Sequence, residues 1–484
     1  MKKILVLNPM TEQTGNVVRD VLYGCWCKGK RIGGGTVPPF SILIVTELLR
    51  SHGLNADFID AQAEQIPPKG IAEIISHYDL LIISTSTMSF REDAEYLRVL
   101  KGSNARLKTM IFGSHPTFMP NYCLAHEGVD IIVRKEPEYI IRDVCLAMKN
   151  HDDYTAVAGI GYKDGAGEPV LNDFYPHIEN LDDLPFPNVD LLPKNIHYFN
   201  PIVSRLPYMT TTTSKGCPAK CIFCTAPAFD GYKFRCQSAD YVIKELQYFI
   251  EKGIREVYFR DDTFFVDKER DHRICRYMID NKMDLTWIAN ARVNMIDKET
   301  MQLARQAGCH LIKLGIESGS QEILDGMYKG YRIEQAYDVF RWAKETGLKT
   351  HAHVMIGNPG ETPETLEQTI RYVLKLGPTT ASFGICTPYP GTKLFERVQK
   401  QCPEIGDGSA TDLSKLHTEG LFNEFYTSLT AKELSRQVRR AYRRFYLRPF
   451  YWCSMLRWNM RSTADVKRLV IAATNLLDFM VRGE

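Results

Sequence analysis

Short apolar runs alternate with amphipathic stretches through the first 150 residues. Residues 3–8 (KILVLN) have the composition of a buried strand, and residues 39–51 carry apolar side chains at helical spacing up to a turn at Gly53. The same alternation predicts strands over 56–60, 80–84 and 108–112 and a helix over 91–100. Strands and helices in this order form a doubly wound, Rossmann-like parallel sheet, which binds ligands beyond the carboxyl ends of its strands.

A second alternating region begins at residue 208. Six strand–helix units predict a partial (β/α)6 TIM barrel, whose functional face is the carboxyl end of the strands. A proline-rich stretch before it predicts an extended linker. The expected strands lie near 208–214, 256–261, 284–290, 310–317, 350–357 and 380–386, and the helices over 239–252, 268–281, 298–307, 333–346 and 362–376. The predicted domains are 1–150, a linker over 151–207, a core over 208–400 and a helical region over 401–484.

Three cysteines follow the first strand of the second region within one turn. Cys217, Cys221 and Cys224 are separated by three and two residues, and Gly216 allows the chain to turn sharply before them. Three thiolates this close together bind three irons of a cubane cluster and leave the fourth iron open. The spacing leaves two alternatives: a zinc site completed by Cys236 or a histidine, and three plain buried thiols.

The cysteine spacing and the stretches after it resemble a known family. The pattern C-x3-C-x2-C, with Phe223 before the last cysteine, resembles the signature of the radical S-adenosylmethionine (SAM) superfamily. The first 150 residues resemble the cobalamin (B12)-binding domain of one branch, which includes class B radical SAM methyltransferases. The resemblance implies three cofactors: a [4Fe-4S] cluster on the cysteines, SAM and cobalamin. It continues through YFRDDTF (258–264), WIANAR (287–292), LGIESGS (314–320), GNPGET (357–362) and TPYPGT (387–392).

The resemblance also implies which residues hold SAM. Asp261 or Asp262 matches the family position that binds the SAM amino group, with a helix cap as the alternative role. Arg292 ends the third strand and suits the SAM carboxylate, unless it is a solvated surface arginine. Glu317 ends an apolar strand, where an unpaired carboxylate is costly, so it needs a partner, and the ribose hydroxyls or amino group of SAM fit. The remaining predicted SAM contacts are Phe223, Gly357 and Gly360, the two glycines through close backbone approach to the adenine.

Two loops at neighbouring strand ends of the first region are rich in small and hydroxylated residues. Ordinary turn chemistry explains such a composition, whereas the resemblance implies contacts with the corrin ring or nucleotide tail of cobalamin. Many cobalamin-binding domains carry Asp-x-His, but this chain has Asp60-Ala61-Gln62, so the resemblance implies a cobalt without a histidine from that motif. The predicted cobalamin contacts are Ser84, Thr85, Ser86, Gly113, Ser114, His115, Thr117 and Glu136.

The family's chemistry implies the function. A reduced cluster cleaves SAM to a 5′-deoxyadenosyl radical that abstracts hydrogen from an unactivated carbon, with electrons from a flavodoxin- or ferredoxin-type donor. With cobalamin, the first expectation is methylation of a small-molecule or lipid substrate, and the alternative is oxidative cyclisation or rearrangement. A further alternative keeps the radical SAM core with a first domain that binds no cobalamin. An expectation of another class is a zinc-stabilised nucleic-acid-binding protein.

Composition agrees with a globular protein in a reducing compartment. The 484 residues are 44% hydrophobic and 24% charged, and the 13 cysteines lack the dense spacing of a disulfide framework. We recognise no signal peptide or membrane span and expect a cytoplasmic protein. Residues 432–468 hold eleven Lys or Arg and two acidic residues, interleaved with aromatics. We expect this tail to pack on the barrel first, to contact a membrane surface second and to bind nucleic acid third.

Overall fold

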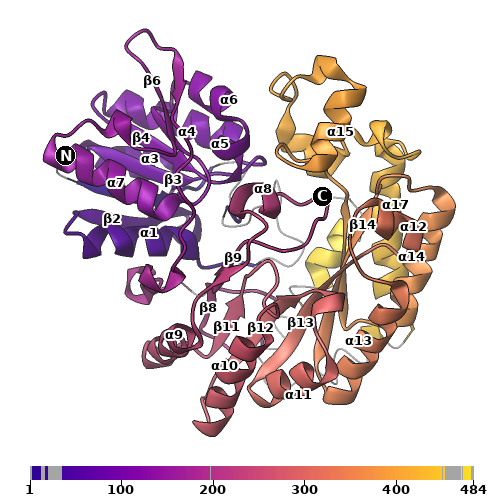
Figure 1. Cartoon of the computed structure of the whole chain (residues 1–484). Coiled ribbons are helices and arrows are strands. Elements are labelled where there is room, and N and C mark those ends of the chain that lie inside the picture. Colours follow the sequence, from indigo (N-terminus) through magenta and orange to yellow (C-terminus); the bar gives the residue numbers. More distant parts are fainter. Residues whose placement is uncertain are drawn as a thin grey trace.

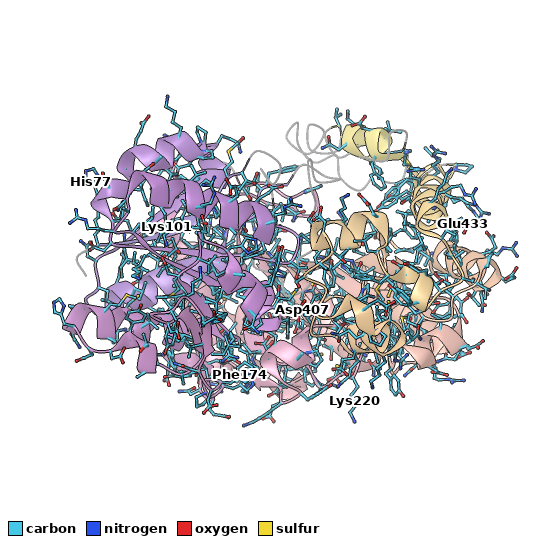
Figure 2. The ribbon with its side chains drawn as sticks, turned by 90° about the horizontal axis from the view of Figure 1, so that it is seen from above. His77, Lys101, Phe174, Lys220, Asp407 and Glu433 are labelled. Carbon is cyan, nitrogen blue, oxygen red and sulfur yellow. The ribbon has the colours of Figure 1, made fainter. Side chains whose placement is uncertain are left out.

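The chain folds into two α/β units that lie side by side (Figure 1). The computed structural model describes residues 3–11, 17–19, 35–196, 198–449, 451–452, 470 and 473–480. Seen from above, the amino-terminal unit carries His77 and Lys101, and Glu433 lies at the opposite end of the molecule on the second unit (Figure 2).

The amino-terminal unit is built on a seven-stranded sheet in the order β2-β1-β3-β4-β5-β6-β7. Alternate side chains of β1 face opposite sides, because Leu5 and Leu7 join one apolar core and Ile4 and Val6 join the other. Helices cover both faces, which confirms the doubly wound prediction. The parallel strands are β1 (Ile4–Asn8), β2 (Ala56–Asp60), β3 (Leu80–Ser84), β4 (Lys108–Phe112) and β5 (Ile131–Val133). Helices α1 (Phe40–Ser51) and α7 (Pro137–Asn150) cover one face, and α3 (Pro68–Ile74), α4 (Phe90–Ser103) and α6 (Pro120–Ala125) cover the other.

Two further strands extend this sheet at one edge. β6 (Ile160–Lys163) pairs antiparallel with β5, and β7 (Pro169–Leu171) pairs antiparallel with β6. These residues fall inside the predicted linker 151–207, so the expectation of an extended chain is wrong here. Strands of four and three residues are too short for apolar–polar alternation to reveal them.

The second unit is an open barrel of six parallel strands in the order β8-β11-β12-β13-β14-β15, with helices on its outer side (Figure 1). β8 and β15 do not pair with each other, as predicted for six units. The strands are β8 (Tyr208–Thr211), β11 (Glu256–Phe259), β12 (Thr286–Ala291), β13 (Cys309–Glu317), β14 (Lys349–Ile356) and β15 (Thr380–Ile385). The helices between them include α9 (Ala239–Glu251), α10 (Lys268–Asp280), α11 (Lys298–Gln306), α12 (Gln321–Gly326), α13 (Ile333–Thr346) and α14 (Pro363–Leu376). A separate hairpin consists of β9 (Ser214–Lys215) and β10 (Arg235–Cys236).

Helix α17 (Ala431–Tyr446) covers the open edge of β15. The Tyr446 hydroxyl accepts a hydrogen bond from the Ala381 N–H at 3.1 Å and donates to the Ala381 carbonyl at 2.7 Å. The Tyr442 hydroxyl accepts from the Phe383 N–H at 3.3 Å. The hydroxyls thereby satisfy backbone groups that an edge strand would otherwise leave unpaired.

The charged side of α17 pairs with the barrel. Glu367 of α14 contacts Arg440 at 3.0 Å and Arg444 at 2.6 Å. The first expectation for the tail, packing on the barrel, therefore holds for its described part; residue 450 and residues 453–468 lie outside the described residues. Among the described helices, none has both the length and the apolar character needed to cross a bilayer.

The last part of the linker packs against the barrel and the first unit. Ile196, Tyr198 and Val203 form a cluster with inward-facing side chains of the barrel such as Ile288. The Tyr198 hydroxyl donates to Asp60 Oδ2 at 2.7 Å. This segment is thus a packed layer between the two units.

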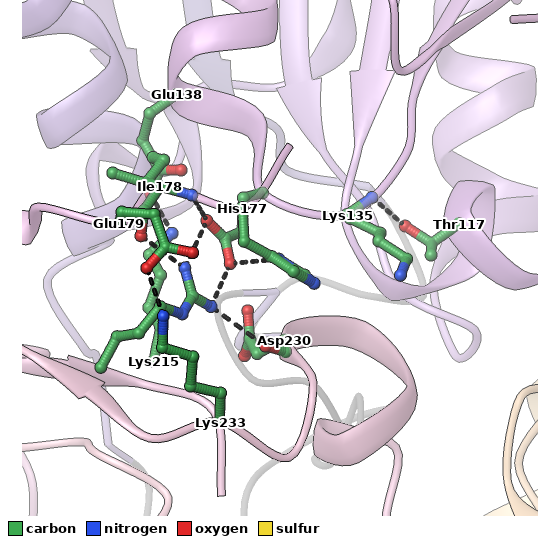
Figure 3. A network of polar contacts seen from close by, with 11 residues as sticks. Thr117, Lys135, Glu138, His177, Ile178, Glu179, Lys215, Asp230 and Lys233 are labelled. Atoms are coloured by element: carbon green, nitrogen blue, oxygen red, sulfur yellow. Dashed lines mark hydrogen bonds and ion pairs between the residues drawn. The ribbon is translucent and has the colours of Figure 1, made fainter. Parts of the chain in front are cut away.

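Buried ion pairs join the β9–β10 hairpin to the start of α7 (Figure 3). Arg235 Nη1 donates to Glu136 Oε2 at 3.1 Å, and Lys215 Nζ contacts Glu138 Oε1 at 2.7 Å. His177 Nδ1 lies 2.8 Å from Glu136 Oε1. Because the two strands of the hairpin enclose residues 216–234, the interface fixes the segment that carries the three cysteines.

We predict that Tyr446→Phe loosens β15. The change leaves the Ala381 N–H buried without its partner, which costs about 1–3 kcal/mol. We expect amide hydrogen exchange in 380–385 to become roughly tenfold faster or more, measured by mass spectrometry of peptides that cover β15. Tyr328→Phe is the control, because Tyr328 is 57% exposed and its hydroxyl does not reach β15. Equal exchange in both variants would contradict this role of α17.

Candidate functional site

The three cysteines lie in a tight turn at the carboxyl end of the barrel, which we call the cysteine turn (residues 216–224). Gly216 has φ +81°, and a Cβ there would lie 2.2 Å from the Lys233 carbonyl oxygen, so only glycine fits. Cys217 and Cys221 are buried and Cys224 is half-buried. Burial raises the pKa of the Cys217 thiol, and the two other cysteines are close enough to Cys224 to affect its pKa electrostatically.

The cysteine turn is held from both sides by backbone hydrogen bonds. The Ile222 N–H donates to the Met327 carbonyl at 3.2 Å, and the Ile222 carbonyl accepts from the Leu394 N–H at 2.9 Å. Within the turn, the Cys224 N–H donates to the Cys221 carbonyl at 3.3 Å. The sulfurs are therefore presented by a rigid segment, as a preformed metal site requires.

The donor set fits an iron–sulfur cubane better than a single zinc ion. Across the part of the chain that the structure describes, no three His, Cys, Asp or Glu side chains converge on one point in the way that one ion needs. In a cubane each thiolate binds a different iron, so convergence is not required. Burial raises the pKa of the Cys236 thiol, the suggested fourth zinc ligand, and the nearby charges that act on this pKa are those of Arg270, Asp267, Asp271 and Asp261, with no contribution from the other cysteines.

The two aspartates that follow β11 have different surroundings in the structure. Asp261 is fully buried, and its Oδ1 accepts hydrogen bonds from the Thr213 N–H at 3.0 Å, the Thr213 hydroxyl at 2.9 Å and the Ser214 hydroxyl. It braces the chain just before the cysteine turn. Asp262 has no hydrogen bond or ion pair with any described residue, and its charge acts on Cys217. Burial, with a smaller effect of the Asp261 charge, raises the pKa of Asp262 to about 7.

Arg292 lies against the cysteine turn. Its Nη1 is 3.4 Å from Cys221 Sγ, and its Nη2 donates to the Lys329 carbonyl. The Nε atom is buried without a partner in the described structure. A buried guanidinium beside sulfur is not the solvated surface arginine that the sequence left open.

Glu317 has a protein partner that the sequence did not reveal. Its Oε1 lies 2.7 Å from Lys329 Nζ, and both side chains are less than a tenth exposed. Glu317 has φ +60° at an irregular point of β13, a backbone conformation that costs energy for a residue with a side chain. Gly315 makes room for the pair, because a Cβ there would lie 2.4 Å from Glu317 Oε1. The partner inferred for Glu317 is thus Lys329, and any contact with SAM stays a prediction.

The remaining predicted SAM contacts differ in their surroundings. Phe223 is half-buried on the barrel core, with its ring centroid 5.8 Å from Lys329 Nζ. Gly357 faces the carboxyl-terminal region, because a Cβ there would lie 2.6 Å from Leu434 Cδ2. The Gly360 N–H donates to the Tyr426 carbonyl at 2.7 Å. The two glycines therefore pack on the carboxyl-terminal region 401–484, and their approach to an adenine stays a prediction.

Loops after β3 and β4 form what we call the ligand edge (84–87 and 113–117). Gly113 has φ +126°, and a Cβ there would lie 2.2 Å from the Thr85 carbonyl, so glycine lets the two loops touch. His115 Nδ1 lies 3.3 Å from Thr87 Oγ1, whereas its Nε2 is buried with no described partner. The Ser84 hydroxyl is also buried without one. Buried polar atoms normally have a hydrogen-bond partner, so these two mark a place where a ligand could bind.

The other predicted residues of the ligand edge are already bonded within the protein. The Thr85 hydroxyl donates to Asp93 at 2.7 Å, and the Thr117 hydroxyl donates to the Gly113 carbonyl at 2.8 Å. Ser86 Oγ lies 3.1 Å from Ser89 Oγ, and Ser114 is buried within α5 (Ser114–Phe118). Hydroxyls with partners shape the loops and are less available to a ligand than Ser84 and His115.

The Glu136 carboxylate is already bound by residues of the linker and of the β9–β10 hairpin. It contacts Arg235 and His177 and also accepts from the Ile178 N–H at 2.9 Å (Figure 3). Burial alone would raise its pKa, but Lys215 and Arg235 hold the pKa of Glu136 at about 2. The structure therefore gives this residue a bracing role between the units, and its predicted contact with cobalamin stays untested.

Gln62 lies away from the crevice of the sheet. The chain leaves β1 toward β2 on one side and returns in β3 on the other, so the crevice lies between β1 and β3. Gln62 follows β2 and accepts from the Val17 N–H at 3.0 Å and from Arg19 at 3.3 Å. The absence of a histidine at position 62 therefore carries less information about the ligands of a bound cobalt than the sequence suggested.

Sequence reasoning missed Lys329, Lys215 and Arg235. No motif marks them, because each acts through a partner far away in the chain. The one signal was the need of a buried Glu317 for a counter-charge.

Comparison with known proteins identifies the family. The model of the radical SAM superfamily matches residues 211–373, and the model of the B12 binding domain matches residues 33–144. An uncharacterized methyltransferase of Pyrococcus horikoshii is 32% identical over 429 residues, 87% of this chain and 90% of that protein. The chain is a B12-binding radical SAM protein.

Two further comparisons extend the picture of this radical SAM protein. An anaerobic magnesium-protoporphyrin IX monomethyl ester cyclase of Rubrivivax gelatinosus is 26% identical over 77% of this chain and 67% of its own length. The solved structure of the cobalamin-dependent SAM radical enzyme OxsB has a TM-score of 0.73 at 16% identity, over 99% of this chain and 72% of that chain, which shows a shared fold.

Family membership confirms the predicted resemblance, fold class and enzyme class. The cofactors of this radical SAM protein are a [4Fe-4S] cluster, SAM and cobalamin, as predicted. The comparisons give no support to a zinc-stabilised nucleic-acid-binding protein.

We predict that Lys329→Met destabilises the barrel strongly. The change leaves Glu317 buried without its counter-charge, at a cost of about 3–5 kcal/mol. Thermal unfolding of the full chain should show a clear fall in melting temperature, and the double variant Glu317→Gln/Lys329→Met should recover most of it. Lys393→Met, which breaks an exposed pair with Glu396, is the control and should cost less than about 1 kcal/mol. Equal effects of the two lysine variants would argue against the buried pair.

Proposed function

We propose that this protein is a cobalamin-dependent radical SAM methyltransferase that acts on an unactivated carbon of a small-molecule or lipid substrate. The observation that carries the proposal is the contact between the ligand edge and the segment of the cysteine turn. Phe118 ends α5 at the ligand edge, and its ring centroid lies 6.3 Å from that of Phe229 in α8 (Ala226–Asp230), the helix after Cys224. A methyl donor at the ligand edge and SAM at the cysteine turn would thus face one substrate chamber.

The names of the relatives favour methyl transfer and leave oxidative ring formation as one alternative reaction. The Pyrococcus horikoshii relative is named a methyltransferase and aligns with most of this chain. The Rubrivivax gelatinosus relative is named a cyclase, so oxidative ring formation is the second candidate reaction. Both reactions need the same three cofactors, and the choice between them depends on the substrate that the chamber accepts.

We assign the cluster to Cys217, Cys221 and Cys224. When bound, the cluster and SAM supply a carbon-centred radical, and cobalamin supplies the methyl group. The protein's part is to hold the sulfurs in a rigid turn through Ile222 and to exclude water from them, because two of the three thiols are buried.

For SAM, we assign the amino group to Asp262 and the carboxylate to Arg292. Asp262 is the aspartate without a described partner, whereas Asp261 holds the chain before the cysteine turn. Arg292 already contacts Cys221, so a carboxylate bound at the open iron would lie within its reach. Phe223, Glu317, Gly357 and Gly360 are assigned to the walls of the SAM site.

For cobalamin, we assign direct polar contacts to Ser84 and His115, whose buried polar atoms have no described partner. Burial lowers the pKa of His115 to about 3, so its imidazole is neutral at physiological pH and offers Nε2 as a donor or acceptor. Gly113 allows close backbone approach. Thr85, Ser86, Ser114 and Thr117 shape the ligand edge, and Glu136 braces it. We place the boundary of this domain near residue 171, after β7, and the start of the radical SAM core at 208.

We propose an electron donor of the flavodoxin or ferredoxin type that docks on the cysteine turn. Pro218 and Lys220 in this turn are exposed, and Lys220 points outward from the molecule (Figure 2). A lysine there suits an acidic donor surface. Contact of 432–468 with a membrane surface gains no support from α17, because its aromatic side chains lie on β15.

We predict that alanine at Cys217, Cys221 and Cys224 abolishes iron binding and SAM cleavage. The anaerobically reconstituted wild-type protein should contain iron and sulfide and release 5′-deoxyadenosine, and the triple variant should do neither. Cys236→Ala is the matched control and should retain both. A colourless wild-type protein with one zinc, lost in Cys236→Ala, would instead support the zinc alternative.

We predict opposite effects for the two aspartates. Asp262→Ala should weaken SAM binding by about tenfold or more, because a charge-assisted hydrogen bond is lost, while iron content stays unchanged. Asp261→Ala should lower iron content, because Thr213 and Ser214 lose their acceptor beside the cysteine turn. Iron analysis and equilibrium binding of SAM measure both. Reversed results would exchange the two roles.

A further inference from the structure

The barrel has a polar layer in its interior that none of the roles assigned above uses. In β13, Leu314 and Ile316 pack outward on the helices, so Lys313 and Gly315 face the interior. In β14, Ala352 and Val354 pack outward in the same way. The inward residues of β14 are therefore His351 and His353, and the strand register places these histidines beside Lys313 and Gly315.

Within the part of the chain that the structure describes, Lys313 has no counter-charge. Its Nζ donates to the Tyr258 hydroxyl at 2.5 Å and lies 4.9 Å from the Tyr258 ring centroid. The Tyr258 hydroxyl in turn donates to Asn290 Oδ1 at 3.2 Å. Among the described residues, no carboxylate forms an ion pair with Lys313. A half-buried ammonium with one neutral partner keeps two N–H groups that can bind a further acceptor.

The two histidines complete the polar layer. His351 Nδ1 lies 2.8 Å from Thr380 Oγ1, and His353 Nδ1 lies 2.9 Å from Ser382 Oγ. Their ring centroids are 4.6 Å apart. His353 Nε2 has no hydrogen bond to any described residue. Ser382 Oγ also lies 3.1 Å from His351 Nε2. In the tautomer in which His353 Nδ1 accepts the hydrogen bond of the serine hydroxyl, its Nε2 carries the ring proton and is a second donor of the layer.

The layer lies between an apolar floor and the rim of the barrel. Below it, Ile288 and Leu311 are covered by the packed linker. Above it, Glu317 pairs with Lys329 at the rim, close to Arg292. Gly315 leaves room for this pair directly above Lys313, because a Cβ there would lie 2.4 Å from Glu317 Oε1 and 2.7 Å from Lys329 Nζ. Since Glu317 already compensates Lys329, the uncompensated positive charge of the interior is at Lys313.

We propose that Lys313 and His353 bind an anionic group of the substrate, a carboxylate or a phosphate. Both groups offer oxygen acceptors to an ammonium and an imidazole N–H. The anion would anchor one end of the substrate in the barrel and leave its carbon skeleton directed toward the rim. This inference rests on the proposed function, because it specifies the substrate of the same chamber.

The test is equilibrium dialysis of the anaerobically reconstituted full-length enzyme, with SAM and cobalamin present, against radiolabelled phosphate and, separately, radiolabelled succinate. We expect one of the two anions to bind the wild-type enzyme and to bind Lys313→Met at least about tenfold more weakly. Lys313→Arg keeps the charge and should retain binding. Lys375→Met is the matched control, because Lys375 is exposed on α14 and also lies 4.9 Å from a tyrosine ring, that of Tyr337.

Iron content, SAM affinity and release of 5′-deoxyadenosine are measured on the same preparations. Iron content and SAM affinity should be unchanged in Lys313→Met, which shows an intact fold and an intact SAM site. Equal anion binding by wild type and Lys313→Met, loss of binding in Lys313→Arg, or weaker SAM binding in Lys313→Met would overturn the proposal. A wild-type enzyme that cleaves SAM but binds neither anion would refute this inference alone, whereas one that cleaves no SAM would refute the proposed function itself.

Discussion

The buried pair of Glu136 and Arg235 is the contact on which the arrangement of the two units depends. Arg235 belongs to the short hairpin that encloses the cysteine turn, and Glu136 immediately precedes α7 of the B12-binding unit. Removing one partner of such a pair leaves a buried charge and costs several kcal/mol, so the two units are held in one relative position. Lys215 and Glu138 add a second pair beside it. The cysteine turn is therefore fixed by the first unit as well as by the barrel, and chemistry that needs both cofactors is favoured by this shared anchor.

A barrel of six strands has two free edges, and the chain covers both with other segments. At β15, the hydroxyls of two tyrosines in α17 accept hydrogen bonds from backbone N–H groups of the strand. Glu367 of α14 forms ion pairs with two arginines of α17. At β8 the side chains of Tyr208 and Thr210 donate to the carbonyls of Thr36 and Pro38, just before α1. The first unit thus closes one edge and the tail closes the other. The aromatic face of α17 therefore packs on β15 of the same chain, which explains why a helix rich in basic and aromatic residues is part of a globular core.

Sequence patterns predicted most of the helices and strands but fewer of the contacts between side chains. β2, β3 and β4 begin and end where the sequence placed them, because each is a short segment with apolar residues between turns, and β3 (LLIIS) is apolar at its first four positions. The three cysteines were found because their spacing is local. The partners Lys329 of Glu317 and Arg235 of Glu136 were not found, because charges far apart in a sequence carry no mark of being neighbours. Asp261 and Asp262 could not be separated for a related reason: adjacent residues have the same sequence context, and only the fold shows that Thr213 and Ser214 engage the first.

The incomplete barrel also explains why inward side chains of its strands can be polar. In a closed barrel of eight strands the inward side chains meet and fill the interior as an apolar core. Here six strands leave the interior open on one side, and the linker fills only its floor with side chains such as Val203. Inward positions above that floor are half-exposed and carry Lys313, His351 and His353, while the outward positions of the same strands are apolar. The alternation that builds the hydrophobic core against the helices therefore also creates, on the other face of β13 and β14, a row of polar side chains.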